Sequence, residues 1–280
     1  MTKSTGDWLE RPLPQALLRW EGALVCLIAW ACFLAVPLSL GELGLSWDAL
    51  NHHIYLGWTA QQHRFGRDLL GAGFQSFTAP YAYWPAYRMA VGGWTGESAG
   101  IVLATLHVIA VWPVWMLARA CVPGTLVFDG AMRLLAVTLA WLSGVVLSAF
   151  GSTMNDVLAA APLVWAVALA MEPAARRRDM APAKARRYVL LSGAGAGLAV
   201  ALKLSNGPLA LLMPGLWLLC AREWRGRIAA MSVGSLGVLA GFLLGYAQWG
   251  WLLWRHFGNP VFPFYDHWFA PVRGWLGGAG

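Results

Sequence analysis

The stretch YVLLSGAGAGLAVALKLSNGPLALLMPGLWLLC, from Tyr188 to Cys220, decides between one long kinked helix and two helices that turn back on each other. Basic residues flank this stretch on both sides. Arg176, Arg177, Arg178, Lys184, Arg186 and Arg187 precede it, and Arg222, Arg225 and Arg227 follow it. Lys and Arg gather on one side of a membrane, so both clusters belong on the same side. The stretch therefore predicts a helical hairpin that turns near SNGP, Ser205 to Pro208.

Composition identifies the chain as an integral membrane protein. Of its 280 residues, 59% are hydrophobic and 12% are charged, whereas a soluble domain has about 25% charged residues. The eighteen Trp suit a protein with two bilayer interfaces, because indole prefers the headgroup layer. Most of the Lys and Arg behind the net charge of +7 lie in short loops, so the charge indicates topology and we expect no nucleic-acid partner. The four cysteines have neither disulfide nor metal-binding spacing.

Apolar runs predict an all-α bundle of about seven membrane spans. Several runs are shorter than the about 20 residues that cross a bilayer, so charge is needed to pair them. It makes 134–172 a second hairpin, which turns near GSTMND. With the N-terminus inside, fourteen of the twenty Lys and Arg lie on the cytoplasmic side, in keeping with the positive-inside rule. The seven ranges are 22–40, 99–118, 134–150, 157–172, 188–203, 207–221 and 228–251.

This topology divides the chain into three parts. Residues 1–20 form a cytoplasmic lead-in, residues 21–253 form a transmembrane module with a long outer loop at 41–98, and residues 254–280 form an outer tail. The outer loop contains the aromatic run FQSFTAPYAYWPAYRM, so we expect helices that lie flat in the headgroup layer. The tyrosines and tryptophan expected at that surface are Tyr81, Tyr83, Trp84 and Tyr87.

The start of the outer loop, SWDALNHHIY, is unusually polar and begins a helix predicted to run from Asp48 to Phe65. On such a helix Asp48, Asn51 or His52, and Tyr55 share a face, which gives a carboxylate with neighbours that can orient it. The alternative is that Asp48 only caps the helix. The two histidines are adjacent and would point to different faces, which argues against a two-histidine metal site.

Two further polar groups fall on the same side of the predicted bundle. Asp156 begins an apolar helix, and an ionisable residue at a membrane edge is a functional candidate, although Asn155 or Asp156 could instead be an N-cap. Lys203 lies between two spans of about 16 residues, or about 24 Å of helix, which is short of the about 30 Å core. The turn should therefore be recessed, and its lysine suits a phosphate or snorkels to the interface.

The tail WRHFGNPVFPFYDHWFAP is the last candidate segment. Its prolines forbid one continuous helix, and its aromatic residues favour the membrane interface. Arg255 and His256 at its start are candidates for binding a substrate beside an outer cavity. The alternative is an aromatic belt that contains a Gly-Asn-Pro turn.

The order and common sidedness of these motifs resemble the GT-C class of membrane glycosyltransferases, which use polyprenyl-phosphate sugars. SWDALNHHIY is similar to the segment that carries an early acid in the first outer loop, and GSTMND is similar to the turn that carries a second acid. GLAVALKLSNGP and FGNPVFPFYDHWF resemble segments of bacterial members whose substrates are uncharacterised. The resemblance covers about residues 20–270.

The resemblance implies a reaction in which lipid phosphate leaves as a sugar moves to an acceptor in the cell envelope. Asp48 would be the base, and Asp156 would orient the acceptor. Lys203, with Arg255, would hold the phosphate. A divalent metal, Mg²⁺ or Mn²⁺, held by Asp48 and Asp156 is an open alternative. The remaining expected substrate-binding residues are Asn51, His52, Tyr55, Asn155 and His256.

The resemblance also implies a place in the cell and leaves other functions open. The protein would lie in a bacterial inner membrane with its active face away from the cytoplasm. Members of the class usually continue with further spans, so we expect a shortened or truncated chain, or one that depends on a partner subunit. The alternatives are a non-catalytic component that binds or transports polyprenyl lipids, and a scaffold subunit of an envelope-polysaccharide assembly. Only sugar transfer requires Asp48 as a base.

Overall fold

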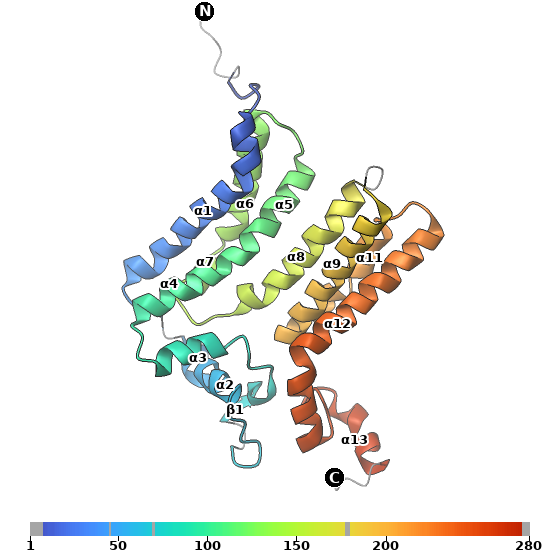
Figure 1. Ribbon diagram of the computed structural model, residues 1–280. Coiled ribbons are helices and arrows are strands. Elements are labelled where there is room, and N and C mark those ends of the chain that lie inside the picture. The colour runs from blue at the N-terminus through green and yellow to red at the C-terminus, as the bar shows by residue number, and fades with distance from the viewer. Residues whose placement is uncertain (1–7, 45, 69–70, 177–179, 276–280) are drawn as a thin grey trace, which may run out of the picture.

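The computed structural model describes residues 8–44, 46–68, 71–176 and 180–275, and these form an all-α bundle with one four-residue strand (Figure 1). The predicted fold class is therefore confirmed. The helices of the bundle are α1 (Gln15–Leu40), α4 (Gly96–His107), α5 (Val111–Cys121), α6 (Val127–Trp141), α7 (Gly144–Ala149), α8 (Asp156–Ala175), α9 (Pro182–Leu202), α10 (Gly207–Ala210), α11 (Met213–Leu218) and α12 (Trp224–Phe257).

Smaller elements gather at one end of the bundle, opposite the N-terminus (Figure 1). The first outer loop begins with a π-helical turn and continues through a short helix, a strand and a second helix. The tail adds one more helix at the same end. These elements are the π-helix Ala49–His53, α2 (Ile54–Thr59), β1 (Gly71–Phe74), the 3-10 turn Gln75–Phe77, α3 (Trp84–Val91) and α13 (Asp266–Trp275).

The seven apolar runs all fold as helical segments that run alternately up and down the bundle (Figure 1). Within the described residues, four helical segments are long and apolar enough to cross a membrane: Gln15–Leu40, Gly96–Cys121, Asp156–Ala175 and Trp224–Phe257. The second of these joins α4 and α5 through a 3-10 turn. Two of the other runs are divided into short helices, because Ser143 caps a new helix and prolines begin α10 and α11. The span count of seven stays a prediction.

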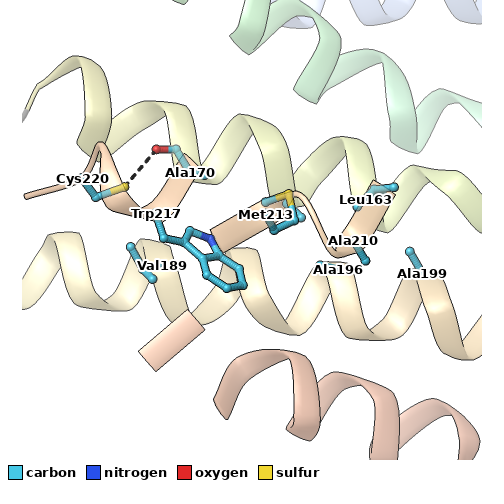
Figure 2. Close-up of a cluster of buried hydrophobic side chains, with 10 residues drawn as sticks. Leu163, Ala170, Val189, Ala196, Ala199, Ala210, Met213, Trp217 and Cys220 are labelled. Carbon is cyan, nitrogen blue, oxygen red and sulfur yellow. Dashed lines mark hydrogen bonds between the residues drawn. The ribbon is translucent and has the colours of Figure 1, made fainter. Parts of the chain in front are cut away.

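The stretch from Tyr188 to Cys220 forms the predicted hairpin. α9 ends at Leu202, and the returning helix α11 packs back against α8 and α9. Figure 2 shows Trp217 beside Val189 in this core, and the Sγ of Cys220 contacts the carbonyl oxygen of Ala170. The indole Nε1 of Trp217 donates to Ser192 Oγ at 3.0 Å, and that hydroxyl donates to the carbonyl of Ala166 at 2.7 Å. These bonds satisfy the polar groups of three neighbouring helices in the apolar interior.

Helices α9 and α12 pack so closely that their backbones are in direct contact. A Cβ added to Gly193 or Gly197 of α9 would collide with carbonyl oxygens of α12, and one added to Gly241 would collide with the carbonyl of Ala194. Small residues allow such contact between helices in a membrane, where van der Waals packing replaces the hydrophobic effect. The pair fixes the end of α9, and with it the position of the turn that follows.

The outer loop departs from its predicted course in one respect. The helix expected from Asp48 to Phe65 ends at Thr59, because the carbonyl of Trp58 accepts from both Gln61 and Gln62 and closes the last turn. The aromatic run after it is also more buried than predicted. Phe77 and Ala79 pack against Trp249 of α12, whose indole Nε1 donates to the Phe77 carbonyl at 2.9 Å. This contact anchors the loop to the bundle.

We predict that Gly197→Ala destabilises the protein, because the added methyl group must push α9 away from α12. The expected loss is about 1–3 kcal/mol, which lowers Tm by roughly 5 °C. Gly215→Ala is the matched control, since a Cβ at this helical position meets no atom within 4 Å. Thermal unfolding in detergent measures both variants. An equal Tm for the two would contradict close α9–α12 packing.

Candidate functional site

A cavity of about 320 Å³ opens at the end of the bundle that carries the outer loop. Its walls come from four separate parts of the chain: the outer loop, the start of α8, the turn after α9 and Phe264 of the tail. Two acids predicted as catalytic and the predicted phosphate-binding lysine lie in this one cavity. The charged, imidazole and phenol side chains that line it are Asp48, His52, His53, Tyr83, Asp156 and Lys203.

Lys203 and Asp156 form an ion pair on one wall of the cavity. Lys203 follows the last residue of α9 in extended backbone, so its side chain leaves the helix, while Asp156 is the first residue of α8. The side-chain amide of Asn206 holds the turn by donating to the carbonyls of Ala159 and Ala199. The side chain of Asp156 is 53% exposed and that of Lys203 is 34% exposed. An exposed ion pair of this kind contributes only about 0–1 kcal/mol to the free energy of unfolding. A stronger anion can therefore compete for Lys203.

Asp48 lies on the cavity wall in a different state. Its side chain is 53% exposed, and the imidazole Nδ1 of His52 is 3.8 Å from its Oδ1. The helix that it precedes is capped instead by Ser46, whose hydroxyl accepts from the backbone N–H of Ala49 at 3.1 Å. In the described part of the chain Asp48 makes no capping hydrogen bond, so the alternative that it serves only as a cap is wrong.

At the start of α8, Asp156 is the first helical residue and Asn155 precedes it. Asn155 occupies the N-cap position, but its side chain makes no capping hydrogen bond with the described residues. It is buried instead, beside Tyr83 of the cavity wall. Burial raises the pKa of the Tyr83 phenol, and the neighbouring Asn155 opposes that shift. Asn155 therefore supports the wall from behind rather than lining the cavity.

Both histidines line the cavity, although they are adjacent in sequence and were expected to point to different faces. The chain is π-helical at Ala49–His53. The two rings are in edge contact with their centroids 4.5 Å apart, and both residues are buried. His53 Nδ1 shares a hydrogen bond of 2.7 Å with Thr153 Oγ1 in the turn before α8. This bond ties the outer loop to the Asp156 turn.

Burial sets the charge of the two imidazoles. It lowers the pKa of His52, and it lowers the pKa of His53 to about 4, helped by the neighbouring His52. Asp48 and Asp156 oppose these shifts by favouring the cation. Both histidines are consequently neutral near pH 7. Of the described residues that line the cavity, Lys203 is then the cation, and it faces the carboxylates of Asp48 and Asp156.

Four other predicted site residues lie outside the cavity wall. Asn51 donates to Gln75 at 3.5 Å, and Gln75 itself lines the cavity. Tyr55 packs against Gly71 and Trp58. Arg255 is exposed at the end of α12. His256 is also exposed, and the centroid of its ring lies 5.2 Å from that of Phe65. α12 continues to Phe257 and carries these two side chains away from the cavity.

Sequence reasoning missed Tyr83 and Thr153. The aromatic run that contains Tyr83 was expected at the membrane surface, but Tyr83 is buried and its ring lies 4.9 Å from that of His53. The feature of the sequence that pointed to Tyr83 as a cavity residue was its presence in the same loop as Asp48. Thr153 is part of the GSTMND turn, and its hydroxyl is too ordinary a group for its role to be read without the fold.

A metal at the two acids stays a prediction. In the ranges that the structure describes, no cluster of three or more His, Cys, Asp or Glu side chains is placed to hold a metal ion. Asp48 and Asp156 line the same cavity, and Asp156 already has Lys203 as its partner.

Comparison with known proteins identifies a family. The model of glycosyltransferase family 87, a family of the GT-C type, matches residues 73–271, which is more than two thirds of the chain. The matched region includes Asp156 and Lys203, while Asp48 and the two cavity histidines precede it. No curated protein and no solved structure matches the chain.

We predict that His53 makes the protein less stable below about pH 6.5. Its pKa is about 4 when folded and about 6.5 when unfolded, so between these values the unfolded state binds the additional proton. The contribution of His53 to the free energy of unfolding is therefore constant well above pH 6.5 and falls as the pH is lowered toward 4, by about 3 kcal/mol in all.

His53→Asn tests this, because the amide can still bond Thr153 but does not titrate. Its Tm should fall less than that of the native protein between pH 7.5 and 5. His267→Asn, at an exposed histidine of the tail, is the control and should keep the native pH dependence. A slope unchanged in His53→Asn would contradict the assignment.

Proposed function

The chain belongs to glycosyltransferase family 87, and on that premise we propose that it transfers a sugar from a polyprenyl-phosphate donor to a lipid or glycan acceptor of the cell envelope. We further propose that it works in a bacterial inner membrane, with the cavity on the face away from the cytoplasm. One observation carries the proposal: Asp48, Asp156 and Lys203, far apart in sequence, line a single cavity at one end of an apolar helical bundle.

Of the two acids, Asp48 is the proposed base. A sugar on a lipid phosphate is already activated, so the enzyme must chiefly remove a proton from the acceptor hydroxyl. Asp156 is already engaged in an ion pair with Lys203, whereas the imidazole within 4 Å of Asp48 is neutral. Half of the Asp48 side chain is exposed, so an acceptor can reach it.

Lys203 is the proposed phosphate ligand. Negative charge grows on the departing phosphate, and a cation placed beforehand stabilises it. Lys203 is only partly exposed but its ion pair with Asp156 is not enclosed, so the donor phosphate can replace or join the carboxylate as its partner. Asp156 then serves to hold the lysine at the cavity until the donor binds and to orient the acceptor.

An apolar groove supports a donor with a lipid tail. The groove has a volume of about 530 Å³ and lies between α8 and the α10–α11 segment, with Leu163 and Val167 on one wall and Leu209 and Leu212 on the other. Leu163 and Asp156 are seven residues apart on the same face of α8, or about 10 Å by the helical rise. A donor with its phosphate on Lys203 could extend its tail along this groove, in contact with lipid.

Asp48→Asn should remove transfer and leave donor binding intact, because the amide keeps the shape of the carboxylate but cannot accept the proton. We expect kcat to fall by roughly 10²–10⁴-fold. The assay uses protein purified in detergent, a polyprenyl-phosphate sugar and membrane extract as the source of acceptor. Asp68→Asn, whose carboxylate pairs with Arg64 outside the cavity, is the control. Transfer at the native rate in Asp48→Asn would show that another group is the base.

Lys203→Met should weaken binding of the donor, since it removes the cation and keeps the apolar stem of the side chain. A hydrogen bond to a charged group contributes about 1.5–3 kcal/mol, so we expect the apparent KM for the donor to rise about 10–100-fold. Lys184→Met, at the opposite end of α9, should leave it unchanged. A native donor KM in Lys203→Met would mean that the lysine serves only to pair with Asp156. Binding without transfer in the native protein would favour a lipid-binding component over an enzyme.

A further inference from the structure

Among the residues that the structure describes, the buried Nδ1 atom of His52 has no hydrogen-bond partner. A buried polar atom left without a partner costs about 1–3 kcal/mol, and such atoms need an explanation. The atom lies beside a cavity already assigned to the reaction, and the carboxylate oxygen within 4 Å of it belongs to Asp48. The structure therefore places an unused donor or acceptor next to the proposed base.

The distance between these two atoms indicates a bond that is not yet made. At 3.8 Å, His52 Nδ1 and Asp48 Oδ1 are beyond the 2.7–3.2 Å of a normal hydrogen bond. The imidazole is 5% exposed and the carboxylate 53%, so Asp48 is the partner that can move. A shift of about 1 Å by its oxygen would close the gap. Catalytic hydrogen bonds are often long before substrate binds and shorten in the reactive complex.

The surroundings of His52 keep its ring in place. Its ring meets that of His53 edge-on at 4.5 Å and lies 6.0 Å from the ring of Tyr83. His53 is held in turn by its bond to Thr153 and by contact with Tyr83. Because Thr153 lies in the turn before α8, the ring pair is anchored to a different part of the bundle from Asp48.

The chemistry of the pair also fits. Burial lowers the pKa of His52, so the ring donates one N–H as a neutral group. A cation at this position would instead form an ion pair with Asp48. A neutral donor fixes the direction of one carboxylate oxygen and leaves the other for the acceptor hydroxyl.

We propose that His52 is a positioning residue for Asp48: its Nδ1–H donates to the carboxylate when the acceptor binds, and His53, bonded to Thr153, holds the His52 ring in place. The proposal rests on the proposed role of Asp48 as the base. It assigns the histidine pair to alignment of the base rather than to a metal or to the donor phosphate.

Three substitutions at one position test the proposal. His52→Asn places an amide N–H near the position of Nδ1, His52→Gln places it near Nε2, and His52→Phe keeps the ring without a donor. We expect His52→Asn to retain kcat within about tenfold of native, and the other two to lose about 10–100-fold. The KM for the donor should stay unchanged in all three, since His52 does not act on the phosphate.

The controls separate positioning from folding. His267→Gln, at the exposed tail histidine, should behave as native. Size-exclusion profiles and Tm values show whether each His52 variant is folded. Equal kcat for folded Asn, Gln and Phe variants would overturn the positioning role, as would a change confined to the donor KM.

Comparison with Asp48→Asn distinguishes the two hypotheses. If Asp48→Asn is inactive while all three His52 variants keep the native kcat, the assignment of Asp48 as the base is supported and the positioning role of His52 is wrong. If Asp48→Asn is active, the base itself is wrong.

Discussion

The close contact between α9 and α12 is the constraint on which the candidate site depends. Glycines allow the two backbones to touch, and in lipid this van der Waals packing takes the place of the hydrophobic effect in holding helices together. Ala201, near the end of α9, packs in one core with Trp249 of α12. The same core receives Phe77 of the outer loop. The contact therefore fixes the position of Lys203 along the bundle and supplies the surface against which the outer loop packs.

The site joins parts of the chain that are distant in sequence through a few polar contacts. The ion pair between Lys203 and Asp156 connects the ends of α9 and α8, and the bond between His53 and Thr153 connects the outer loop to the turn before α8. These contacts leave the two acids unlike each other. One has a lysine as its partner, while the other faces a neutral imidazole, and this difference suits separate duties toward a phosphate and a hydroxyl.

Charge and apolar length were enough to predict the bundle, the hairpin turns and the placement of Asp156 and Lys203 at the same end, because all of these follow from which side of a membrane each residue occupies. His52 lines the cavity as predicted, whereas the contact of its ring with that of His53 could not be read from sequence, because periodicity does not show where two neighbouring rings meet. Arg255 and His256 were misplaced because the direction of a side chain at a helix end depends on where that helix stops. Tyr83 was missed since an aromatic residue suits both an interface and a cavity wall.

The most direct test of the central claim is an experimental structure of the protein with a polyprenyl-phosphate sugar bound. We expect the phosphate within hydrogen-bond distance of Lys203 Nζ, with the sugar in the cavity beside Asp48. A phosphate bound at the opposite end of the bundle, where Arg119 and Arg176 line a larger cavity, would contradict the assignment of the active face.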